Sequence, residues 1–405
     1  MSSVPTHEAA PTGAAAERAV PLALWFLALA NIFDMGGVFG AKYLSYALAA
    51  AVLALKFSEC RVAPGRLALL VGMFLVWPVV SVLKGLADGA TAREAIGELT
   101  PFLPGLLTYF LVSPITGVRP LEILMNGLVL MAVATASIFM LLLVAPDSAP
   151  AALLLSVLGR EGHGYFGVRQ LGSVVIPNVY FKATLFLVPA FAWFLFRRQF
   201  WLAALCVLGL ALAFSRAGLA LAAVVLAGFM LVGSARQRIM TLAFVAVITV
   251  LAIYNADLLH LAEYFARVQD ALLGRDDSAQ ARIGHFGSLL ALLDRDALQL
   301  WFGQGAGTAF YSEGAGAWVT DIELDHLDAI RQFGLAWFVI FAGLVLSVVA
   351  AARKAVPHGT AAAIALAVAF VASGTNPVLI NPLFMMLLAV VARFAESGSP
   401  RRLLS

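Results

Sequence analysis

Long apolar runs separated by polar segments dominate the chain from residue 20 to residue 395. A helix that crosses a bilayer needs about 20 apolar residues, and most of the runs approach that length. The pattern therefore predicts about twelve membrane-spanning helices. They are expected at residues 20–33, 37–57, 66–84, 100–116, 120–145, 178–196, 199–214, 217–233, 238–255, 335–352, 359–376 and 379–395.

The polar segments between these runs differ greatly in length. Residues 256–334 form the longest, and a loop of that size without its own secondary structure would be unusual. Within it, Leu258–Leu273 and Ala279–Leu293 have the apolar spacing of helices. The prediction is an all-α polytopic membrane protein with five regions. These are a disordered tail over 1–19, spanning helices over 20–255, a large helical loop over 256–334, three more spanning helices over 335–395, and a tail over 396–405.

Composition supports this class and excludes others. Hydrophobic residues make up 62% of the 405 residues and charged residues 12%, against roughly 45–50% and 25% in soluble domains. A soluble enzyme, a disordered chain, a fibrous protein and a nucleic-acid binder with a basic face are excluded. The two cysteines, Cys60 and Cys206, have no metal-ligand spacing, and neither a P-loop nor a zinc signature is present. No metal or cofactor is predicted.

The charged residues divide unequally between the two sides of the membrane if the N-terminus is placed in the cytoplasm and each span crosses once. The loops on that side carry 14 basic and five acidic residues, whereas the other side carries 12 basic and 18 acidic residues. Short cytoplasmic loops are enriched in lysine and arginine. Both termini are therefore expected in the cytoplasm, and the long loops outside it.

Charged residues are absent from the late runs 335–352 and 359–392. Ion-coupled transporters usually place ionisable groups near the membrane midplane. The pattern favours chemistry at the outer membrane–water interface, on a substrate with a lipid part and a polar part. The alternative is that outer loops of any membrane protein are polar.

Three basic residues close to the ends of apolar runs are candidate anion ligands. Arg216 lies in Ser215–Arg216–Ala217–Gly218, Arg169 precedes the sixth run, and Lys182 lies inside its start. The guanidinium group donates in a planar fork that suits phosphate oxygens. Alternatively, these side chains reach the membrane interface as anchors.

The large loop holds two further candidates. Arg282 and His285 are three residues apart and share a face if the segment is helical. Gly303, Gly305 and Gly307 alternate with other residues, a pattern that fits either a backbone nest for an anion or a plain turn.

A dense acidic segment precedes the tenth run. On a helix, Glu323 and His326 would share one face, and three aspartates would lie on the neighbouring face: Asp321, Asp325 and Asp328. Crowded carboxylates raise one another's pKa, which suits a general acid or base. Arg331 follows in the same segment. The alternative is a polar loop that caps the next helix.

The order of these parts resembles the O-antigen polymerase and ligase family of bacterial surface-polysaccharide enzymes. The likeness covers roughly residues 165–350 and lies in Ser215–Gly218, the Arg282 segment, Gly303–Gly307 and Glu323–Asp328. It implies a fold like that of class C glycosyltransferases in the bacterial inner membrane. It also implies a metal-independent reaction at the periplasmic face on undecaprenyl-diphosphate-linked oligosaccharide.

The resemblance also implies roles for the candidates. Glu323 or His326 would accept the proton of the attacking sugar hydroxyl, and Glu323 is preferred. Arg216 and Arg282, with Arg169, would stabilise charge on the departing diphosphate. Further substrate contacts would come from five residues: Lys182, His285, Asp325, Asp328 and Arg331. Implied partners are membrane lipids and a chain-length regulator or export protein, with no nucleic acid.

Glu-Leu-Asp-His stands here where ligases of the family usually have a His-Asn-like pair. This departure favours a polymerase of O-antigen, capsule or exopolysaccharide repeats. The alternatives are a ligase that transfers glycan to lipid A core or protein, a flippase for lipid-linked sugars, and a non-catalytic scaffold of an export complex.

Overall fold

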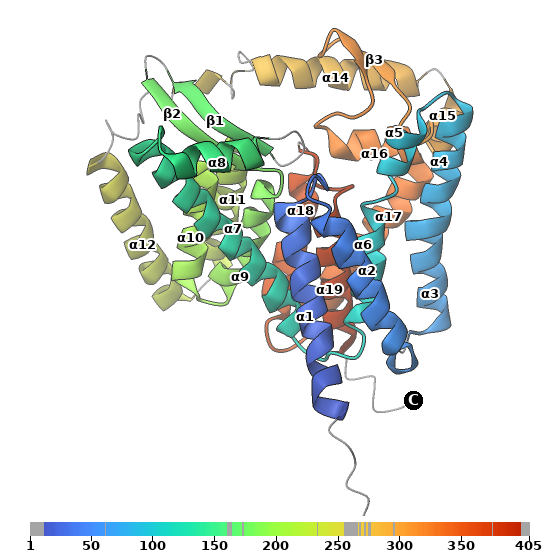
Figure 1. Cartoon of the computed structure of the whole chain (residues 1–405), viewed down its shortest axis with the longest axis horizontal. Coiled ribbons are helices and arrows are strands. Elements are labelled where there is room, and N and C mark those ends of the chain that lie inside the picture. The colour runs from blue at the N-terminus through green and yellow to red at the C-terminus, as the bar shows by residue number, and fades with distance from the viewer. Residues whose placement is uncertain are drawn as a thin grey trace, which may run out of the picture.

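The computed structural model describes most of the chain (Figure 1). The described residues are 12–60, 62–159, 164–171, 174–232, 234–254, 266, 269–270, 273, 277–294, 296–374 and 376–397. Within them a helix lies in each of the twelve predicted apolar segments. The predicted helix over Leu258–Leu273 falls largely outside the described residues.

The first half of the chain is mostly helical. Helix α3 continues into α4 through the π-helical turn η2 (Gly72–Val76), so that Pro64–Ala87 forms one long apolar stretch. The helices are α1 (Thr12–Phe33), α2 (Ala41–Leu55), α3 (Pro64–Val71), α4 (Trp77–Ala87), α5 (Ala92–Gly97), α6 (Phe102–Leu111), α7 (Arg119–Val144) and α8 (Ala149–Leu158). A short 3-10 turn, η1 (Phe57–Glu59), follows α2.

The second half of the chain is also mostly helical and contains two β-hairpins. The first hairpin pairs β1 (Gly164–Leu171) with β2 (Val174–Phe181), and the second pairs β3 (Phe310–Ser312) with β4 (Ala317–Val319). The remaining elements are η3 (Thr184–Phe186), α9 (Leu187–Phe196), α10 (Phe200–Leu212), α11 (Arg216–Val232), α12 (Ala235–Tyr254), α14 (Asp277–Leu293), α15 (Ala297–Phe302), α16 (Asp325–Phe333), α17 (Leu335–Arg353), α18 (Gly359–Ala372) and α19 (Pro382–Ser397).

Helix α19 lies in the middle of the bundle. It packs against α6 and α17, and residues 382–391 are buried all round it. Aromatic rings fill the neighbouring space, where Trp337 stacks on Phe341 with centroids 4.7 Å apart. The interior is therefore apolar all round α19, as expected for a helix that contacts other helices on every side.

The outer surface of the bundle is also apolar. Leu44, Leu83, Leu231 and Leu346 lie on four different helices and are each more than half exposed. Three helical stretches are long and apolar enough to cross a membrane among the residues that the structure describes: Pro64–Ala87, Arg119–Val144 and Leu335–Arg353. Exposed apolar helix faces of this extent indicate association with a membrane.

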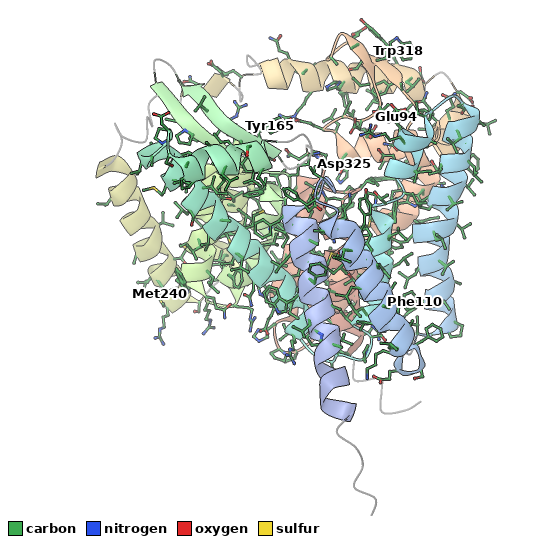
Figure 2. The ribbon with its side chains drawn as sticks, in the orientation of Figure 1. Glu94, Phe110, Tyr165, Met240, Trp318 and Asp325 are labelled. Atoms are coloured by element: carbon green, nitrogen blue, oxygen red, sulfur yellow. The ribbon has the colours of Figure 1, made fainter. Side chains whose placement is uncertain are left out.

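One end of the bundle is covered by loop elements, and we call it the loop end. It is formed by α5, α8, β1–β2, α14, α15, β3–β4 and α16, with α14 lying across the top of Figure 1. Glu94, Tyr165, Trp318 and Asp325 mark this end in Figure 2, and Phe110 and Met240 lie toward the opposite end.

The opposite end holds ion pairs between helix termini. Arg197, in the turn after α9, contacts Glu122 of α7 at 2.7 Å. Arg393 of α19 donates to Glu396 at 2.5 Å, and Glu396 also contacts Arg66 at 2.6 Å. These three arginines are among the basic residues of the loops that the sequence predicts to be cytoplasmic.

Four local predictions are wrong. The tail predicted over 1–19 enters helix α1 at Thr12, and α19 continues to Ser397. The sixth apolar run does not begin with helix, because residues 178–181 pair with β1 in an antiparallel hairpin. Its register places Tyr180 opposite Tyr165. Lys182 is therefore an exposed residue just after a strand, not a lysine inside a membrane helix.

Candidate active site at the loop end

A buried arginine holds the loop end together. Arg331, in the last turn of α16, has no exposed surface. Its Nε donates to Asp328 Oδ1 at 2.7 Å, its Nη1 to Thr308 O at 2.6 Å, and its Nη2 to Thr320 O. Its guanidinium also lies over the Phe310 ring at 4.9 Å. Because a buried charge is costly unless it is paired and hydrogen-bonded, this arginine positions protein segments.

Two buried aspartates connect α16 to its neighbours. Asp325 Oδ2 accepts the backbone N–H groups of Leu379 and Ile380, in the turn between α18 and α19. Asp328 accepts from Arg331 and, at 2.8 Å, from Gln332 Nε2. The predicted substrate ligands Asp325, Asp328 and Arg331 are therefore brought together, but with protein partners.

The glycine segment 303–307 packs backbone against backbone. Gly303 and Gly305 have φ of +75° and +108°, and a Cβ would lie 2.4 Å from Gln332 O and from Gly85 N, respectively. The N–H groups of Gln304, Gly305 and Ala306 donate to carbonyl oxygens of α16 and α4. These three N–H groups are therefore occupied by protein carbonyls. The segment forms a turn, and the predicted anion nest is wrong for these three amides.

The exposed part of the site centres on an ion pair. Arg282 of α14 donates through Nη2 to Glu323 Oε2, and their side chains are 32% and 52% exposed. Arg282 Nε is buried without an acceptor. An unsatisfied donor beside a carboxylate is a group that a bound anion can satisfy.

Two further side chains surround this ion pair. Tyr180 of β2 is close enough to Glu323 for the glutamate charge to act on it. Burial first, then the charges of Glu323 and Tyr165, raise the pKa of Tyr180 to about 12. His285 Nδ1 contacts Ser312 Oγ at 2.5 Å, and burial lowers its pKa. Arg282 and His285 do lie on one helix, as their spacing predicts, because α14 includes both.

The other predicted base lies elsewhere. His326 Nε2 contacts Phe370 O at 3.0 Å and Ser373 Oγ at 2.7 Å, and its ring packs against Phe338. Burial lowers the pKa of His326. The predicted shared helix face of Glu323 and His326 is wrong, because α16 begins at Asp325 and Glu323 precedes it. Asp321 also precedes this helix.

The remaining predicted cations lie on other elements. Arg216 begins α11, where Ser215 Oγ accepts the N–H of Gly218 at 3.3 Å, and α11 packs against α18. Arg169 lies on β1 opposite Ile176, and its side chain is outside the described part. Lys182 is close enough for its charge to act on Lys42. Among the contacts that the structure describes, Glu323 pairs with Arg282 and not with the other predicted arginines.

One residue of this network is not predicted from the sequence. Glu98 follows α5 and lies beside the side chain of Gln332. Burial first, then the charges of Asp328 and Asp321, raise its pKa to about 8, whereas the charge of Arg331 and a hydrogen bond from Gln332 act to lower it. Its only signal in the sequence is its place in the polar segment 85–99, between the apolar runs 66–84 and 100–116. Groups of three or more potential metal ligands are absent from the described residues.

Comparison with known proteins adds no relative. The chain matches no family model, and no curated protein or solved structure is significantly similar to it.

Proposed function

We propose that the protein is a membrane-embedded glycosyltransferase that polymerises oligosaccharide repeats carried on undecaprenyl diphosphate. The observation that carries the proposal is the Arg282–Glu323 pair, partly exposed above a bundle of apolar helices. It combines a donor for phosphate oxygens with an acceptor for a hydroxyl proton. A lipid-linked donor is already activated, so the reaction needs no nucleotide.

In this reaction a sugar hydroxyl of one substrate attacks the anomeric carbon of another. The new bond joins the hydroxyl oxygen to that carbon, and the bond between the carbon and the diphosphate oxygen breaks. The diphosphate leaves with the electron pair and stays on its lipid. Glu323 takes the hydroxyl proton, and Arg282, with Arg216 and Arg169, stabilises the charge that grows on the diphosphate.

A groove on the bundle supports a substrate with a lipid part. It has a volume of about 600 Å³ and is lined by apolar side chains of α3, η2, α4 and α17. Trp77 and Lys84 line it, and Lys84 Nζ donates to Gly303 O toward the loop end. An apolar groove with an ammonium at one end suits a lipid that carries an anionic group.

The proposal includes an orientation in the bacterial inner membrane. Twelve spans, with both termini in the cytoplasm, place the loop end in the periplasm. Tags inserted at positions 198, 236 and 354 are expected to be cytoplasmic, and a tag at 275 periplasmic, when probed with a membrane-impermeant reagent. Protection of the tag at 275 would contradict this orientation.

Extension of a defined lipid-diphosphate repeat by the purified protein tests the function directly. We expect products longer by whole repeats, together with release of lipid diphosphate. Transfer to lipid A core alone would make the protein a ligase, and movement of substrate across vesicles without a new bond would make it a flippase. In a deletion strain, loss of the polymerase leaves single repeats, whereas loss of a ligase leaves long chains on the carrier.

A further inference from the structure

Two exposed aromatic side chains lie side by side on the hairpin β3–β4. Tyr311 and Trp318 are opposite each other in the register of the two strands. They are 52% and 71% exposed, and their ring centroids are 6.2 Å apart at an interplanar angle of 72°. Single exposed apolar residues are ordinary, whereas adjacent Tyr and Trp rings supply a large contact area at a low cost in conformational entropy.

The other face of this hairpin is held by protein contacts. Phe310 is 3% exposed, and Ser312 Oγ contacts His285 Nδ1 of α14. At the tip of the hairpin, the N–H of Glu313 donates to Ser288 Oγ at 2.9 Å. Because these contacts fix the hairpin from its buried face, the outer rings are available for a ligand.

A small apolar core joins the hairpin to the Arg282–Glu323 pair. Phe310 packs with Leu289 of α14 and with Ile322, the residue before Glu323. One core therefore holds α14, the hairpin and the segment before α16 in a constant arrangement. The second strand of the hairpin ends a few residues before Glu323.

The chain between the hairpin and Glu323 sets an upper limit on their separation. Trp318 precedes Glu323 by five residues, so their Cα atoms are at most about 18 Å apart. An oligosaccharide of a few sugars can span this distance. A glycan that reacts at the ion pair can therefore extend as far as the rings.

The position of the two rings favours a sugar ligand over a lipid surface. Exposed Trp and Tyr side chains in membrane proteins commonly lie at the membrane–water interface. Here β3 lies at the outer edge of the loop end, and Trp318 is on the side away from the apolar helices (Figure 1, Figure 2). The C–H face of a pyranose ring is apolar and complements the negative face of an aromatic ring. Asp321, exposed three residues after Trp318, can accept a hydrogen bond from a sugar hydroxyl.

We propose that Tyr311 and Trp318 form a sugar-binding platform for the oligosaccharide part of the substrate. The ligand class is a glycan of pyranose sugars, and the bound glycan extends from the platform to the Arg282–Glu323 pair. Because the two rings meet edge to face, the ring that presents its edge keeps both of its faces clear of the other ring. The role in chain extension rests on the proposed function, whereas the binding of sugar does not.

Binding of a lipid-free glycan to the purified full chain tests the platform. The probe is the surface polysaccharide of the source organism, released from lipid and cut into fragments of a few repeats. Titration calorimetry is done in a detergent without a sugar headgroup. We expect Trp318→Leu, which keeps an apolar side chain but removes the ring, to weaken binding about tenfold. Trp318→Phe keeps an aromatic ring and should stay within about threefold of the wild type.

Trp201→Leu is the matched control, because Trp201 is 68% exposed on α10, which is not part of the loop end. It should bind the fragments as the wild type does. All three variants should unfold near the wild-type temperature, because both tryptophans are exposed. Equal affinity of Trp318→Leu and the wild type would overturn the proposal, and so would an absence of binding by the wild type.

A membrane role for Trp318 is tested in nanodiscs with brominated lipid chains, which quench tryptophans that lie within the bilayer. The fluorescence of Trp318 is the difference between the signals of the wild type and Trp318→Phe. We expect this difference to be the same in brominated and ordinary lipid. Quenching of the Trp318 signal would overturn the proposal in favour of a membrane anchor.

Chain extension separates this proposal from the proposed function. If both hold, Trp318→Leu raises the KM for the glycan acceptor about tenfold, and the loss is recovered at high acceptor concentration. An unchanged KM would overturn the platform alone. Glycan binding that depends on Trp318, without extension by the wild type, would contradict the proposed function alone.

Discussion

Glu323→Gln is expected to lower chain extension by roughly 10²–10⁴-fold, the range typical of general acid–base catalysis. The amide keeps the size of the side chain but cannot accept a proton from a sugar hydroxyl. The side chain of Glu323 is 52% exposed, so the variant should fold normally. The measurement is the rate of extension of a defined lipid-diphosphate repeat by purified protein.

Glu313→Gln is the matched control, because Glu313 is also an exposed glutamate of the loop end. It should extend chains at the wild-type rate, and both variants should unfold near the wild-type temperature. Normal extension by Glu323→Gln would rule out Glu323 as the base. His326 would then be the remaining candidate base from the sequence, although its Nε2 already contacts Phe370 O and Ser373 Oγ.

Arg331→Met is expected to destabilise the protein by about 3–5 kcal/mol, the cost of removing one partner from a buried ion pair. The substitution leaves Asp328 buried without its guanidinium and removes the donors to Thr308 and Thr320. Thermal unfolding in detergent should show a midpoint lower by roughly 10 °C, since 1 kcal/mol corresponds to a few degrees.

Arg353→Met provides the control, because Arg353 is an exposed arginine at the end of α17. It should change stability by no more than about 0.5 kcal/mol. The double variant Asp328→Leu with Arg331→Met should recover part of the loss, because an apolar pair can replace a buried ion pair. An unchanged midpoint for Arg331→Met would show that the buried network does not stabilise the loop end.

The loop end was harder to predict from the sequence than the bundle. Spacing correctly predicts a helix over 279–293, and α14 occupies Asp277–Leu293. Spacing does not predict that Glu323 lies outside α16, because helical periodicity carries no information about where a helix starts. The hairpin β1–β2 was missed because its second strand, Val-Val-Ile-Pro-Asn-Val-Tyr-Phe, merges with the apolar run that follows it.

The buried network shows the same limit for side chains. In the sequence, Arg331 is one more basic residue in a polar loop, and Glu98 lies more than two hundred residues away. Their relation depends on the fold, which brings the charge of Arg331 close enough to act on Glu98. The resemblance implies a substrate contact for Arg331, and the structure adds that its guanidinium donates to Asp328, Thr308 and Thr320.

The sequence by itself determined that the chain is mostly helical, where its apolar helices lie, and that they fit association with a membrane. That information is local, because the free energy of placing a residue in lipid or water depends mainly on its own side chain and near neighbours. Only the tertiary structure decided which polar residues meet at the loop end, which charges are buried, and which carboxylate stays exposed beside Arg282. Those properties arise from contacts between residues far apart in the chain, and burial and pairing then change their chemistry.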